Sequence, residues 1–252
     1  MRTYCASTLP FSAFQLTEFV GGLSQNGVSA IELAQSHFSE ADPETINALR
    51  EETGLRFKSM LSTVAVDAPD GLEALIEILD TAQRLSIPMV SIASGGKEDA
   101  TAGEIETIID LLKRVTEEAQ ARNLTLMLYA HEGSLAYNLE RTQHILTAIS
   151  AENFGFYYSP FHFHRGGDDP VVALRTLSER LFSVYFNCGV DSRTGSEPFW
   201  APEMDFPAIC QEIDRVGYTD EIMLIYLGLT AETPQPIIAG VANARAQLES
   251  YF

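Results

Sequence analysis

Eight short, apolar, β-rich runs alternate with longer amphipathic stretches, and this pattern predicts an α/β protein, a single (β/α)8 TIM barrel. The chain of 252 residues has the length that this fold typically needs. Each run is also nearly continuous in apolar residues, as parallel strands covered on both faces must be. No linker, low-complexity run or strong internal repeat interrupts the pattern, so we expect residues 1–252 to form one domain.

The strands are predicted, in order, at 3–8, 29–33, 55–61, 87–93, 124–130, 154–159, 181–188 and 221–227. Apolar residues at three-to-four-residue spacing predict helices at 71–85 and 103–122. Asp42-Pro43 and Asp169-Pro170 each place an acidic cap before a proline at the first helical turn, which predicts two further helix starts. An open doubly wound sheet is the alternative fold. It is disfavoured because residues 7–14, the first strand-to-helix turn, lack the glycine fingerprint of a dinucleotide site.

The charge of the chain excludes one class of partner. With 16 Lys+Arg against 35 Asp+Glu, the formal net charge is −19, so too few cations are present to neutralise a nucleic-acid backbone. The three cysteines, Cys5, Cys188 and Cys210, form no disulfide framework or zinc motif. We find no signal-like segment and no apolar run of bilayer length, so we expect a soluble, cytoplasmic protein that does not bind membranes. Assembly into a homo-oligomer is left open.

Polar side chains recur at the predicted strand ends, where the sites of barrel enzymes lie. We expect these residues to line a small-molecule site: Glu32 and His37 after the second strand, Tyr129, His131 and Glu132 after the fifth, Ser159 and His162 after the sixth, Tyr185, Asn187 and Arg193 after the seventh, and Tyr226 at the eighth.

Three of these residues are the candidate catalytic groups. His131 and His162 follow adjacent strands, and two imidazoles that converge on one molecule suit proton transfer near neutral pH. Glu32 lies in an apolar strand and would be costly to bury without a partner, which favours a role in a pocket. The alternative for each histidine is a hydrogen-bonded structural role. For residues 162–170, "HFHRGGDDP", a turn followed by a helix cap is favoured over a metal or phosphate loop.

The sequence resembles the sugar phosphate isomerase/epimerase members of the xylose isomerase-like TIM barrel superfamily. The resemblance spans nearly the whole chain and is clearest in "SAIEL" (29–33), "SPFH" (159–162) and the segment 204–226 that leads into the eighth strand. It implies a (β/α)8 barrel that moves protons between adjacent carbons of a sugar, with a divalent metal such as Mn²⁺ or Mg²⁺ at the mouth of the barrel. His162 matches a histidine that contacts substrate in the family pattern.

This chain departs from the family pattern at the metal ligands. The resemblance implies a glutamate, an aspartate, a histidine and a second glutamate at positions that here hold Tyr129, Ser159, Tyr185 (or Asn187, if the alignment is shifted by two) and Tyr226. Neutral phenols are poor ligands for a hard dication. We therefore expect no metal cofactor.

Two hypotheses follow. The first is a metal-independent enzyme that acts on a sugar or related keto compound, with His131 and His162 as acid and base and hydroxyl groups as hydrogen-bond donors. The second is a non-catalytic descendant, a ligand-binding barrel or partner subunit in which tyrosines fill the former metal pocket. A phosphorylated substrate would need a cation, for which Lys97, Arg165 and Arg193 are candidates, and an unphosphorylated one fits equally well.

Overall fold

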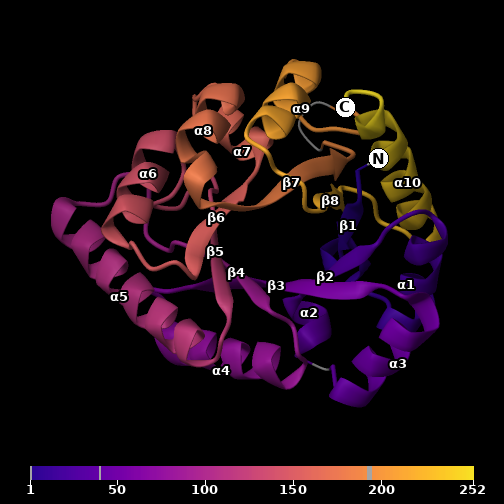
Figure 1. Ribbon diagram of the computed structural model, residues 1–252, viewed down its shortest axis with the longest axis horizontal. Helices are drawn as coiled ribbons and strands as arrows, with labels where there is room; N and C mark the ends of the chain where they lie inside the picture. The colour runs from indigo at the N-terminus through magenta and orange to yellow at the C-terminus, as the bar shows by residue number, and fades with distance from the viewer. Residues whose placement is uncertain (1, 40, 192–194) are drawn as a thin grey trace. The chain divides into compact units, whose positions relative to one another are not determined.

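The computed structural model describes residues 2–39, 41–191 and 195–252. Eight parallel strands follow one another in chain order and close into a barrel, with helices between them, so the fold is the predicted single (β/α)8 TIM barrel (Figure 1). The strands are β1 (Tyr4–Ser7), β2 (Ala30–Ala34), β3 (Arg56–Ala65), β4 (Met89–Ala93), β5 (Thr125–Tyr129), β6 (Phe154–Tyr158), β7 (Leu181–Gly189) and β8 (Ile222–Leu227).

The connecting helices are α1 (Leu16–Gln25), α2 (Gln35–Phe38), α3 (Pro43–Thr53), α4 (Gly71–Arg84), α5 (Ala102–Ala121), α6 (Leu139–Ala148), α7 (Pro160–Arg165), α8 (Pro170–Leu177), α9 (Phe206–Arg215) and α10 (Gln235–Glu249). Short 3-10 turns occupy Leu9–Phe11 and Ser178–Arg180. In the described ranges, none of the helices has the length and apolar character that a bilayer span requires.

All eight predicted strands are present, with ends that differ by a few residues. The largest difference is β3, which continues to Ala65 because its pairing with β4 shifts register between Leu61 and Ala65 and then resumes. β2 and β6 are buried at every residue, which is the burial expected for strands covered on both faces.

The predicted helix caps are confirmed, with one correction. Asp42 accepts a hydrogen bond from the backbone N–H of Thr45, and Asp169 accepts from Val171 N–H at the start of α8. The cap expected from the run 162–170 would include Asp168 beside Asp169, but Asp168 instead accepts from Leu139 N–H, at the start of α6.

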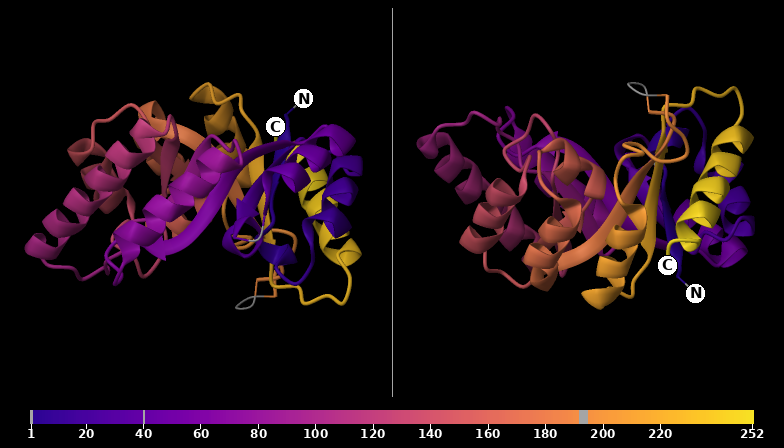
Figure 2. Two further views of the ribbon diagram at one scale, coloured as in Figure 1. Left: turned by 90° about the horizontal axis from the view of Figure 1, so that it is seen from below. Right: turned by 90° about the horizontal axis from the view of Figure 1, so that it is seen from above.

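By their contacts the residues form two compact units, one of residues 1–58 and 183–252 and the other of residues 59–182. In the first unit, α10 packs beside α1 and β8 (Figure 2). In the second, β4, β5 and β6 lie side by side and α4 packs against α5 (Figure 1). The expectation that residues 1–252 are one domain stays a prediction.

Candidate active site

The second unit brings together five of the predicted site residues, and they follow two neighbouring strands. Tyr129 is the last residue of β5, and its strand pairs with β6 in the register Tyr129 to Tyr157. Parallel pairing in this register places the loop after β5 beside the start of α7, which follows β6 directly. The loop after β5 carries His131 and Glu132, and α7 with its N-cap carries Ser159 and His162.

The two histidines are in direct contact. The ring centroids of His131 and His162 lie 4.5 Å apart, with an angle of 40° between the ring planes. The Tyr129 ring meets His131 edge-on at 6.4 Å. The prediction that His131 and His162 converge is therefore confirmed as geometry, while their catalytic roles stay predictions.

The environments of the two imidazoles differ. His131 is exposed, whereas the side chain of His162 lies under the surface and the residue is only 5% exposed. Burial, and secondly the neighbouring His131 ring, lower the pKa of His162 to about 3, so this ring is neutral near pH 7. A neutral imidazole donates and accepts hydrogen bonds, but it has no proton to release as an acid at that pH.

The hydrogen bonding of His131 fixes which ring nitrogen carries the proton. Its Nδ1 lies 2.6 Å from the backbone carbonyl oxygen of Glu132, and a carbonyl can only accept. Nδ1 therefore carries the hydrogen, and in the neutral ring Nε2 keeps its lone pair. This arrangement leaves His131 with a basic nitrogen on an exposed ring.

The other predicted residues of this unit form bonds within the protein. The hydroxyl of Tyr129 donates to the carbonyl oxygen of Ser62 at 3.2 Å. Ser159 is the N-cap of α7, where its hydroxyl oxygen accepts from His162 N–H at 3.4 Å. The carboxylate of Glu132 forms an ion pair with Arg165 at 3.2 Å, so this candidate phosphate-binding cation already has an anionic partner.

The first unit holds the other predicted site residues, of which Glu32 and His37 come first along the chain. Glu32 is fully buried in the middle of β2, opposite Ser7 of β1. His37 donates from Nε2 to the Phe14 carbonyl oxygen at 3.1 Å and packs edge-on against Phe19, which is a structural role in the wall of a separate cavity. Substrate contact by His37 stays a prediction, as does the role of Glu32.

Strands β7 and β8 carry the remaining predicted residues of the first unit. Tyr185 and Asn187 are two positions apart on β7 and therefore face the same side of the sheet, and both are buried. The Tyr226 hydroxyl donates to Glu197 Oε1 at 2.8 Å. Burial, and secondly this bond to Glu197, raise the pKa of Tyr226, so its phenol stays neutral. Arg193 lies outside the described residues.

Sequence reasoning missed two polar residues that bond near these positions, Glu197 and Glu98, and one buried cation elsewhere, Lys58. Glu197 reaches Tyr226 because residues 198–200 lie along the end of β7, where Gly189 N–H donates to Pro198 O at 2.7 Å and Trp200 N–H donates to Asn187 O at 3.3 Å. Glu98, in the loop after β4, accepts from Gly133 N–H at 2.7 Å. Lys58 is a cation inside an otherwise apolar strand, and that lone charge was the signal that could have marked it as paired.

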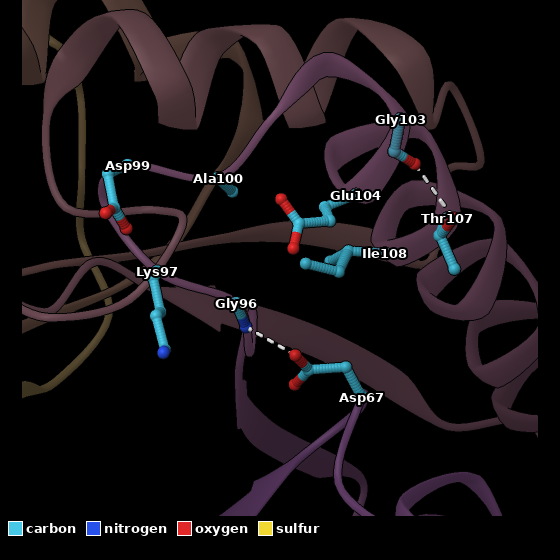
Figure 3. A pocket seen from close by; sticks show the side chains of 9 residues that line it. All are labelled: Asp67, Gly96, Lys97, Asp99, Ala100, Gly103, Glu104, Thr107 and Ile108. Carbon is cyan, nitrogen blue, oxygen red and sulfur yellow. Dashed lines mark hydrogen bonds between the residues drawn. The ribbon is translucent and has the colours of Figure 1, made fainter.

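A cavity of about 460 Å³ lies beside the loop after β4 (Figure 3). Apart from the candidate cation Lys97, its lining contains none of the predicted site residues; it consists of Asp67, Gly96, Lys97, Asp99, Ala100, Gly103, Glu104, Thr107 and Ile108. Lys97, the second candidate phosphate-binding cation, therefore shares its surroundings with three carboxylates, which disfavours an anionic ligand here.

The residues at the positions that the family resemblance assigns to metal ligands do not fit a divalent metal. Among the described residues no three His, Cys, Asp or Glu side chains gather as a metal-binding group. The positions that the resemblance assigns to ligands hold three phenols and a serine, and the Ser159 oxygen serves as a helix cap. A dication needs anionic oxygen or imidazole ligands, which these positions lack.

The fold and these side chains define the class: a TIM barrel protein with its polar groups in the loops that follow the strands, where the sites of this fold lie. Residues 22–245 match the family described as xylose isomerase-like TIM barrel, and the chain belongs to that family. The same loops hold the histidine pair.

Individual relatives agree with this assignment. An inosose isomerase of Bacillus velezensis is 22% identical over 231 residues, which cover 83% of this chain and 77% of that protein. The crystal structure of the IolI protein with a bound zinc atom superimposes with a TM-score of 0.83 at 15% identity, covering 100% of this chain and 99% of that one. An L-ribulose 3-epimerase superimposes with a TM-score of 0.81 at 17% identity, covering 100% and 94%. The chain is thus similar to sugar isomerases and epimerases.

Proposed function

We propose that this protein moves a proton at a carbon next to a keto group of a small polyhydroxy compound, without the divalent metal of its relatives. The observation that carries the proposal is the contact between the exposed His131, with its basic Nε2, and the buried, neutral His162. The substrate class is supported by the similarity to an inosose isomerase and an L-ribulose 3-epimerase, both of which act on such compounds by name.

In this mechanism His131 is the base. Its Nε2 takes the proton from the carbon, the electrons of the C–H bond move into the carbonyl, and an enediolate forms with the negative charge on oxygen. The neutral His162 supplies an N–H donor to that oxygen, and a dry, fixed donor of this kind stabilises a developing oxyanion. The His131 imidazolium then returns the proton to the neighbouring carbon on the same face, while the proton of the adjacent hydroxyl group moves to the former carbonyl oxygen, so that the carbonyl and the hydroxyl exchange places.

This assignment differs from the sequence-based hypothesis, in which His131 and His162 act as acid and base. With a pKa of about 3, His162 cannot serve as a protonated acid near pH 7, so both proton transfers pass through His131. Contact of substrate with Tyr129, Glu132 or Ser159 remains part of the proposal. For Glu32, Tyr185, Asn187 and Tyr226 of the first unit, contact with a ligand stays a separate prediction from the sequence. The sequence-based expectation of a cytoplasmic location belongs to the proposal too.

The test follows solvent deuterium into carbon. L-Ribulose, D-fructose and an inosose are each incubated with the protein in D₂O, and proton NMR measures loss of the signal from the carbon next to the ketone. We expect exchange with at least one compound, and His131→Gln to slow it by about 100-fold, the usual worth of general base catalysis. His144→Gln, an exposed histidine on α6, is the matched control. Exchange that survives His131→Gln would overturn the mechanism.

The second candidate function is a non-catalytic sugar-binding barrel. It is favoured by the internal hydrogen bonds of Tyr129 and Tyr226, because both hydroxyls are used inside the protein. Line broadening of a sugar by the protein, with no deuterium uptake at any carbon, would support this candidate and reject the first.

A further inference from the structure

The loop that carries His131 is closed by its own hydrogen bonds. His131 N–H donates to the Ala136 carbonyl oxygen at 3.0 Å, and the Ser134 hydroxyl donates to the His131 carbonyl oxygen at 2.7 Å. Gly133, at φ +82°, supplies the left-handed backbone that the turn requires. Residues 131–136 therefore form a turn that is closed by hydrogen bonds between its own residues.

Two hydrogen bonds join this turn to the loop after β4. Leu135 N–H donates to the Gly95 carbonyl oxygen at 2.9 Å, and Ala136 N–H donates to the Ser94 hydroxyl at 3.0 Å. These bonds fix the far end of the turn. They leave the peptide between residues 132 and 133 to be held by other groups.

The loop after β4 is in turn anchored to the loop after β3. Asp67 Oδ2 accepts from Gly96 N–H at 3.0 Å, as the dashed line in Figure 3 shows. Gly96 has φ +66°, a left-handed conformation that favours glycine. Glu98 lies two residues further along this anchored loop.

Glu98 binds the same peptide group that binds His131. The peptide between Glu132 and Gly133 donates its N–H to Glu98 Oε1 at 2.7 Å and accepts His131 Nδ1–H on its carbonyl oxygen at 2.6 Å. A carboxylate and an imidazole thus sit on opposite ends of one planar unit. Hydrogen bonds in such a chain polarise one another, so the acceptor at one end strengthens the bond at the other.

We infer that Glu98 is a positioning residue, which holds His131 in its Nδ1–H tautomer through the Glu132–Gly133 peptide. The inference rests on the proposed function for its catalytic consequence, but its structural part does not. It assigns Glu98 the task that an orienting carboxylate performs directly in other histidine-containing sites, with one peptide group between the two side chains. The peptide cannot turn away without losing the bond to Glu98.

The ion pair of Glu132 with Arg165 at 3.2 Å holds the same residue from the side of α7. This ion pair restrains the Glu132 side chain, whereas the hydrogen bonds at 2.7 Å and 2.6 Å act on the peptide group itself. The orientation of the peptide therefore depends more directly on Glu98 than on Arg165.

The decisive readout is the nitrogen spectrum of His131. In protein labelled with ¹⁵N-histidine, long-range ¹H–¹⁵N correlation separates a ring protonated at Nδ1 from one protonated at Nε2, and comparison with His131→Gln identifies the signals. Wild-type protein at pH 8 is expected to give the Nδ1–H pattern. Glu98→Ala is expected to give a mixture of the two tautomers and to slow deuterium uptake on the order of tenfold.

Two further variants separate positioning from folding. Glu98→Gln keeps a side-chain oxygen that accepts from Gly133 N–H, so it is expected to restore the Nδ1–H pattern. Asp99→Ala removes an exposed carboxylate from the same loop and is expected to change neither readout. An unchanged Nδ1–H pattern in Glu98→Ala, or a mixture in Glu98→Gln, would overturn the inference. If wild-type protein catalyses no exchange, the proposed function fails while the tautomer result still stands.

Discussion

The amino ends of β3 and β8 and the loop after β5 both collect polar groups at the ends of strands, but they do so with different chemistry. At β3 and β8 the groups are full charges: Lys58 Nζ lies 2.7 Å from Asp220 and 3.3 Å from Glu221, and Arg56 pairs with both acids. In the loop after β5 the groups are imidazoles, hydroxyls and backbone amides.

The two regions differ in how their polar groups are held: those at β3 and β8 include a buried ion pair, whereas the loop after β5 carries an exposed imidazole. Lys58 and Glu221 are 5% and 3% exposed, and their opposite charges are paired within the protein. His131 is exposed, and the hydrogen bond of its Nδ1 leaves Nε2 as the basic atom. In TIM barrels the amino-terminal face typically serves stability and the carboxyl-terminal loops carry the active site, so the proposed role of His131 agrees with its place in the fold.

The largest effect is expected at the charged cluster. Lys58→Ala leaves the buried Glu221, among the residues that the structure describes, with the exposed Arg56 as its remaining cationic partner, so we expect a loss of about 3 kcal/mol in the free energy of unfolding, measured with urea. Lys113→Ala breaks an exposed pair with Asp110 and should cost less than about 0.5 kcal/mol. Equal losses in the two variants would mean that the cluster is no stronger than a surface pair.

The next effect concerns pH and the buried histidine. The pKa of His162 is about 3 in the folded protein, below the ordinary value near 6.5, so the unfolded chain binds this proton more readily. Stability should therefore fall as the pH drops from about 6.5 towards about 3, by about 1.4 kcal/mol per pH unit from this group alone. Above that window the group adds no pH dependence.

Urea unfolding between pH 4 and pH 7 checks this prediction by comparing slopes. His162→Gln should remove the contribution of the group, and the control His144→Gln, at an exposed position, should keep it. Parallel curves for wild type and His162→Gln would show that the ring titrates normally and that its burial does not favour the neutral form.

The smallest effect is expected at the end of β8. Tyr226→Phe removes the hydroxyl that donates to Glu197 at 2.8 Å, which should cost about 1 kcal/mol of stability, the net worth of one hydrogen bond. Tyr251→Phe removes an exposed hydroxyl that accepts from Gln247 and should cost less. A Tyr226→Phe variant as stable as wild type would show that this bond adds nothing, and would leave the Tyr226 hydroxyl available for a ligand.

Much of the fold could be predicted from the sequence because strand runs and caps are local signals. The eight apolar runs and the Asp42 and Asp169 caps depend on a few neighbouring residues, and all are present. The continuation of β3 to Ala65 was missed because it depends on how the strand pairs with β4. Asp168 bonds to a helix start 29 positions earlier, which no local pattern encodes.

The candidate site divides in the same way. The contact of His131 with His162 was predictable, since both follow adjacent strands of a parallel barrel. The neutrality of His162 was not, because it depends on burial by the surrounding chain. Glu98 was missed as well: in "GGKEDA" it resembles any solvated loop acid, and its role depends on a bond to Gly133 in another loop.

The central claim is proton transfer by His131 without a metal, and the most direct measurement is the rate of deuterium uptake with and without metal ions. The protein is stripped with EDTA, and uptake from the best of the three keto compounds is then measured before and after addition of Mn²⁺, Mg²⁺, Zn²⁺ or Co²⁺. We expect rates that agree within about twofold, because the family's ligand positions hold Tyr129, Ser159, Tyr185 and Tyr226. Uptake that appears only after a metal is added would contradict the account.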